Sequence, residues 1–224
     1  MAFSPADHDR IASAIATAEA TTSGEIVCVV TEQAHRYVST GLAAAAVIAF
    51  ALPFAALWLG ADYAALMPWR SWTSDPAADL RAGIEAYAVV QIAIFAVASA
   101  LGAWTGVGAL LTPRAVKRER VHKEALSQFR ARGIGRTRAR TGVLIYVSMA
   151  DHIAEVVADE GIYAKVPPEF WGTTVAALIA GLKAGDPARG FVDAVALAGG
   201  VLAQHFPPEA SDNPNELPDR LIEL

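Results

Sequence analysis

The chain has 224 residues, of which 54% are hydrophobic, and its formal net charge is −5. A mean hydropathy of +0.35 is high for a soluble protein, and the acidic balance argues against a nucleic-acid partner for the whole chain. The single cysteine, Cys28, excludes an internal disulfide and is expected to be a small buried side chain in an apolar stretch.

The first 37 residues are predicted to hold one helix and one strand. The run SPAD at 4–7 opens the helix, because proline suits its first turn and aspartate favours its N-terminal end. Residues 1–20 lack the continuous apolar core of a signal peptide, so we expect the chain to begin in the cytoplasm. The strand is EIVCVVT at 25–31, which is apolar on both faces and therefore needs covering on both sides.

Two long stretches without any charged residue follow, at 38–61 and 86–112. Each exceeds the roughly 20 residues that a helix needs to cross a ~30 Å hydrocarbon core. A chain of this length has no core large enough to surround two such helices. We therefore expect a transmembrane hairpin over 38–112, with a polar connector at 62–85. Pro53 should kink the first helix without preventing a span.

The charges on either side of this hairpin differ. Residues 112–140 hold ten basic and two acidic side chains, whereas the 62–85 connector holds two basic and four acidic ones. The positive-inside rule places both termini in the cytoplasm and the connector outside, as in a multi-pass protein of the cell inner membrane. Contact with anionic headgroups explains the basic run more simply than binding to RNA or DNA. The side chains expected at the membrane surface are Arg114, Lys117, Arg118, Arg120 and Lys123.

The chain beyond the hairpin supplies the cover that the first strand needs. We expect helices at 113–132, 169–183 and 186–205, and strands at 141–148 and 152–158. Residues 1–37 and 113–206 then form one α/β domain, a small mixed sheet of at least three strands with helices on both faces. The proline-rich tail, 207–224, is expected to run irregularly.

Several stretches together resemble the TPM domain family, and in particular its bacterial membrane-embedded branch. They are SGEIVCVVTE (23–32), RTGVLIYVSMADHIAEVVADEGI (140–162), Trp171 with its helix, AGGVLAQHFP (198–207) and NELPD (215–219). The resemblance implies a three-layer α/β/α domain interrupted by the hairpin. Plant relatives are linked to acid phosphatase activity, divalent-cation binding and turnover of a membrane complex, and the resemblance implies these functions more loosely.

Three acidic residues are the candidate metal ligands. Asp159 and Glu160 follow the strand at 152–158, at a strand end where α/β domains often bind ligands, and Glu25 begins the first strand. Their oxygens suit a hard divalent cation such as calcium. The alternative is structural: Asp159 caps the turn through a backbone N–H, and Glu160 is solvated.

Three functions remain open at this stage. The first is an accessory factor for assembly, maintenance or regulation of a membrane complex. The second is a membrane-tethered, metal-dependent phosphatase or hydrolase, although no nucleophile motif is visible and the catalytic residues stay unassigned. The third, a transporter subunit, needs a homo-oligomer and lacks the charged residues within the spans that mark transport sites. The expected partners are the lipid bilayer and a membrane protein complex.

Overall fold

The computed structural model describes residues 3–32, 37–66, 76–167, 169–208 and 215–224. The chain divides into two compact units. One joins residues 1–35 to 114–224 and is called the α/β domain, and the other is residues 36–113, called the hairpin. The α/β domain is therefore built from two stretches of sequence that lie on either side of the hairpin.

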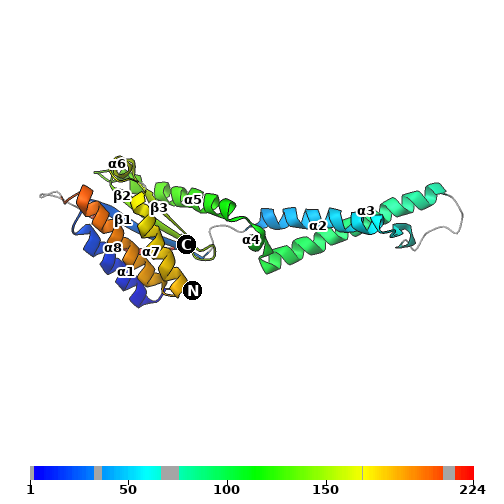
Figure 1. The fold of residues 1–224 in the computed structure, drawn as a ribbon, viewed down its shortest axis with the longest axis horizontal. Coiled ribbons are helices and arrows are strands. Elements are labelled where there is room, and N and C mark those ends of the chain that lie inside the picture. The colour runs from blue at the N-terminus through cyan, green and yellow to red at the C-terminus, as the bar shows by residue number, and fades with distance from the viewer. Residues whose placement is uncertain (1–2, 33–36, 67–75, 168, 209–214) are drawn as a thin grey trace. The chain divides into compact units, whose positions relative to one another are not determined.

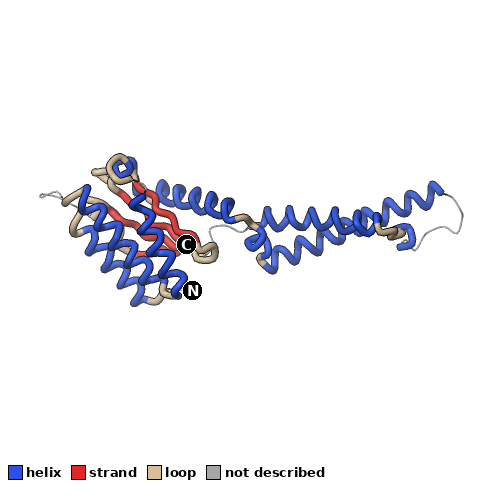
Figure 2. Tube along the Cα trace, in the orientation of Figure 1, coloured by secondary structure: helices blue, strands red, loops and turns tan. Residues whose placement is uncertain are grey.

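The α/β domain is organised around one mixed sheet, whose strands are red in Figure 2. The sheet has four strands in the order β3-β2-β1-β4. Its strands are β1 (Glu25–Thr31), β2 (Gly142–Ser148), β3 (Ile153–Ala158) and β4 (Leu221–Glu223). β1 runs parallel to β2 and to β4, while β3 is antiparallel to β2. Since β1 and β2 are buried along their whole length, they read as continuous apolar runs rather than alternating ones.

Helices cover both faces of this sheet (Figure 1). On one face lie α1 (Pro5–Glu19), α7 (Glu169–Ala184) and α8 (Pro187–His205), and on the other lies α5 (Arg114–Ala131). Alternate β1 side chains divide between them: Ile26 and Cys28 pack with the three-helix layer, and Val27 and Val29 pack with α5. The predicted three-layer α/β fold with a mixed sheet is confirmed, and Cys28 is fully buried.

Side-chain caps fix where two of the helices begin. At α1, the Asp7 N–H donates to Ser4 Oγ at 3.2 Å and the Ser4 N–H donates to Asp7 Oδ2 at 3.0 Å, a reciprocal capping box. At α8, Asp186 Oδ1 accepts the Arg189 N–H at 2.9 Å, and Pro187 occupies the first helical position. The last residues differ from the expected irregular course, because Leu221–Glu223 pairs with β1.

The hairpin consists of two long helices and two short ones. They are α2 (Val38–Trp58), η1 (Tyr63–Leu66), α3 (Pro76–Thr105) and α4 (Val107–Leu111). α3 begins ten residues before the predicted start of its span, and a break at Gly106 separates it from α4. Gly106 has φ 65°, a left-handed conformation that favours glycine. By length and composition alone, α2 and α3 are each suited to cross a bilayer.

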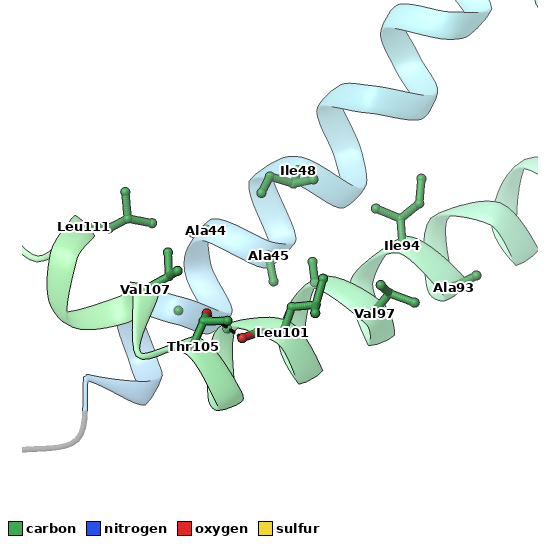
Figure 3. Close-up of a pocket in the computed structure, with 13 residues that line it drawn as sticks. Ala44, Ala45, Ile48, Ala93, Ile94, Val97, Leu101, Thr105, Val107 and Leu111 are labelled. Atoms are coloured by element: carbon green, nitrogen blue, oxygen red, sulfur yellow. Dashed lines mark hydrogen bonds between the residues drawn. The ribbon is translucent and has the colours of Figure 1, made fainter.

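An apolar groove of about 530 Å³ opens between α2, α3 and α4 (Figure 3). Ala44, Ala45 and Ile48 line it from α2, and Val97 and Leu101 line it from α3. The Thr105 hydroxyl donates to the Leu101 carbonyl at 2.7 Å, so this polar group is satisfied within its own helix. The groove is therefore suited to apolar contacts, such as those with a lipid chain or an apolar side chain.

Candidate functional site at the amino-terminal edge of the parallel strands

The sheet register brings Glu25 and Asp159 to the same edge. Glu25 pairs with Gly142, and the Asp159 N–H donates to the Gly142 carbonyl at 2.9 Å. Because β3 is antiparallel, its carboxyl end lies beside the amino ends of β1 and β2. Asp159 does follow the carboxyl end of β3, but that end lies at the amino-terminal edge of the parallel strands, whereas ligands in α/β domains usually bind at the carboxyl ends of parallel strands. Asp151, in the turn between β2 and β3, lies at the opposite edge.

Asp159 caps the short helix α6 (Glu160–Tyr163). Its Oδ1 accepts the Glu160 N–H at 2.7 Å, so the structural alternative for this residue is observed. The Asp159 Oδ2 atom is buried and has no hydrogen-bond partner among the described residues. Glu160 is exposed, and its carboxylate lies 3.8 Å from the Arg140 guanidinium. One carboxylate oxygen is therefore left for a ligand at this turn.

Glu25 holds the C-terminal NELPD segment instead of facing Asp159. Its carboxylate is buried and accepts the backbone N–H groups of Glu216 at 3.4 Å and Leu217 at 3.1 Å. The Glu216 carboxylate in turn accepts the Arg138 N–H at 3.1 Å. Burial raises the pKa of Glu25, although the two backbone donors oppose that effect. Glu25 also lies close to the carboxylates of Glu19 and Asp219. We call these three residues the carboxylate clasp.

Glu19 is the second buried carboxylate of the clasp. Its Oε1 accepts the Ile26 N–H at 2.7 Å, and only 8% of the residue is exposed. Burial, and then the neighbouring carboxylates of Glu25 and Asp219, raise the pKa of Glu19 to about 8. Asp219 also accepts the Asn215 side-chain N–H at 2.6 Å. The raised pKa favours the protonated form of Glu19 at neutral pH.

Sequence reasoning missed Glu19, although a signal for it exists. Ile11 and Ile15 are fully buried on α1, and Glu19 continues their spacing by one more helical step of four residues. A carboxylate at a position that should be apolar predicts a buried acid with a raised pKa. Asp219 lies within the NELPD stretch that carried the family resemblance, but nothing local indicated that it meets Glu19.

The three predicted metal ligands do not converge. No group of three or more acidic, histidine or cysteine side chains suited to a metal occurs within the described ranges. Both Glu25 oxygens and Asp159 Oδ1 already accept backbone N–H groups, and Glu160 faces Arg140. A hard cation prefers six to eight oxygens, so the buried Asp159 Oδ2 alone is an incomplete ligand set.

The five basic side chains predicted at the membrane surface all belong to α5. Lys117 has a structural partner, since its Nζ lies 3.4 Å from Asp151 Oδ1 and the Asp151 side chain is 1% exposed. Asp151 Oδ2 also accepts the Ser148 hydroxyl at 3.0 Å. Lys123 pairs with Glu119 at 2.6 Å on the open surface. Membrane contact by the five cations stays a prediction. Lys117 also pairs with the buried Asp151 carboxylate within the α/β domain.

Comparison with known proteins gives one family and one similar structure. The sequence profile of the TPM domain matches residues 91–201, which run from within α3 to within α8. The NMR structure of BA42 protein from the psychrophilic bacterium Bizionia argentinensis is similar, with a TM-score of 0.56 over 100% of this chain and 97% of that one. The identity is 20%, so this likeness shows the fold alone. A search of curated proteins gave no match.

Proposed function

Because the chain belongs to the TPM domain family, we propose that it is an integral membrane protein whose α/β domain assists assembly, maintenance or regulation of a membrane complex. The exposed apolar surface of the hairpin carries this proposal. Phe54 is 64% exposed and Trp58 is 82% exposed on α2, and Trp104 is 93% exposed on α3. Apolar patches of this extent mark surfaces that contact lipid or another protein.

The proposed orientation puts the α/β domain in the cytoplasm of a cell with an inner membrane. The five α5 cations support it, because basic residues next to a span favour the cytoplasmic side and contact anionic lipid. A reporter active only outside the cytoplasm should be active when fused after Leu66 and silent when fused after Leu224. The reverse pattern contradicts the orientation, and release of the chain by alkaline carbonate contradicts membrane insertion.

The accessory role predicts a stable association with a larger membrane complex. After extraction in mild detergent, the chain should migrate on a native gel with that complex and show no turnover of phosphate esters. Removal of the chain should lower the amount or the repair of the complex, and not the transport of a small solute. Migration as a lone monomer or as a homo-oligomer, with no heavier complex, contradicts the role.

The second candidate function is a metal-dependent phosphatase, and the observation that favours it is the buried, unpartnered Asp159 Oδ2 atom. A divalent cation bound there would supply Lewis-acid chemistry, and Asp159 would be the residue that holds it. Calcium titration should then give a binding heat that Asp159→Asn removes and Glu169→Gln, an exposed control on α7, retains. Equal binding by wild type and Asp159→Asn excludes this site.

A further inference from the structure

The outer side of β3 presents unpaired backbone groups. β3 is the edge strand of the sheet next to β2, and the Asp159 N–H donates to the Gly142 carbonyl of that neighbour. Hydrogen bonding alternates along an antiparallel pair, so the N–H and C=O groups of Ala154 and Val156 point away from β2. None of the described strands pairs with this side of β3. Edge strands of this kind are templates for an added strand.

A groove of about 370 Å³ runs along this edge, beside residues 153–156. α5 contributes Arg118 to one wall, while α7 contributes Trp171, Gly172, Val175 and Ile179 to the other. The α7 wall is apolar, apart from the Trp171 indole N–H, which is buried without an acceptor among the described residues. At 3.4 Å per residue, the four β3 residues can pair with about 14 Å of an extended chain.

We propose that this groove binds an extended segment of a partner protein as an added strand beside β3. Side chains of such a strand alternate between two sides, so its apolar residues would face Val175 and Ile179 on α7. Its alternate residues would face α5, where the exposed Arg118 guanidinium forms no ion pair with the residues that the structure describes and suits a carboxylate. Glu155 does not compete for Arg118, because its carboxylate lies 2.8 Å from His122 Nδ1.

The shape of the groove favours a single extended chain over a second copy of this protein. α7 packs on β3 from one face of the sheet, and α5 packs on it from the other. Pairing of β3 with β3 of a second copy would bring the same two flanking helices of that copy against these walls. A lone strand carries no such helices. The groove lies wholly within the α/β domain, so the inference does not depend on insertion of the hairpin in a membrane.

The test uses the full chain in mild detergent and a random library of linear decapeptides. Peptides selected on the wild type should alternate apolar with polar residues and carry an acidic residue. Gly172→Leu fills the groove, since no atom lies within 4 Å of a Cβ at this exposed helical position. It should weaken the selected peptides about tenfold or more, as expected for losing two backbone hydrogen bonds. Gly200→Leu, equally open but on α8, should leave their affinity unchanged.

The charge contact has its own exchange experiment. Arg118→Glu should weaken the selected acidic peptide roughly fivefold, and exchange of its acidic residue for lysine should restore binding to that variant only. Three results overturn the proposal: no sequence is enriched, Gly172→Leu binds the enriched peptides as wild type does, or wild type is a dimer that Gly172→Leu dissociates. The last result would assign the groove to a second copy of the chain.

Discussion

The buried Glu19 carboxyl should make the stability of the α/β domain fall as pH rises. Its pKa is raised from an ordinary value of 4.5 to about 8 in the folded domain, first by burial. Between these values the unfolded chain loses the proton and the folded domain keeps it. The contribution to stability is therefore fully present below pH 4.5 and is lost progressively up to pH 8. The slope is at most about 1.4 kcal/mol per pH unit, with a ceiling of about 5 kcal/mol across the window.

Glu19→Gln should remove this part of the slope. The glutamine oxygen still accepts the Ile26 N–H, and the side chain cannot ionise. Hydrogen exchange of β1 and β2 amides between pH 5 and 8.5, corrected for intrinsic rates, gives the opening free energy of the domain. A smaller slope should remain from Glu25, whose pKa burial also raises. Glu169→Gln, on the exposed start of α7, should match wild type. If Glu19→Gln keeps the wild-type slope, Glu19 is not protonated in the folded domain.

Two further predictions concern packing within the domain. Lys117→Met should destabilise it by about 3 kcal/mol, seen as a lower Tm, because the Asp151 carboxylate stays buried without its cation. A Tm equal to wild type would show that this pair contributes nothing. Gly142→Ala should cost about 3 kcal/mol, since its Cβ would collide with the Ile134 carbonyl oxygen. Gly200→Ala, with open space around its Cβ, should instead stabilise α8 by up to about 1 kcal/mol. A lower Tm for Gly200→Ala than for Gly142→Ala would contradict these contacts.

Local patterns were sufficient to predict much of the α/β domain. Asp186 and Pro187 mark the start of α8 from adjacent residues, and the structure has its helix at Pro187–His205. Hydropathy alone placed the start of α3 too late. It registers only the apolar part of a helix, whereas Pro76 and the residues after it extend the helix through a polar stretch.

The features that sequence missed depend on long-range pairing. β4 is three residues long and has no pattern of its own, because it forms only where β1 offers a free side. The clasp joins Glu19 on α1 to Asp219 near the C terminus, about 200 residues later in the chain. The short turn between β2 and β3 does imply an antiparallel pair, but which ends of β1 and β2 lie beside Asp159 follows only from the parallel pairing of β1 with β2. Each of these required the strand order, which the sequence leaves open.

The hairpin interrupts one connection of an otherwise complete β-α-β unit, and this predicts that the α/β domain folds without it. The two ends of the interrupted connection meet at the β2–β3 turn. The Met149 N–H donates to the Thr31 carbonyl at 2.9 Å, and Lys117 pairs with Asp151 on the same turn. About six glycine and serine residues, with a mean span near 13 Å, should replace 36–113 and join β1 to α5.

Such a shortened chain should be a soluble monomer that retains the slowly exchanging amides of β1 and β2, because the residues of both core clusters lie outside the hairpin. The control is a chain in which a linker of the same length and composition replaces β3 and so connects β2 toward α7. This control should not fold. An aggregated or molten product from the first deletion would mean that the connection from β1 to α5 forms only when the hairpin is present. The sheet would then form only after the hairpin, and the two compact units would be one folding unit.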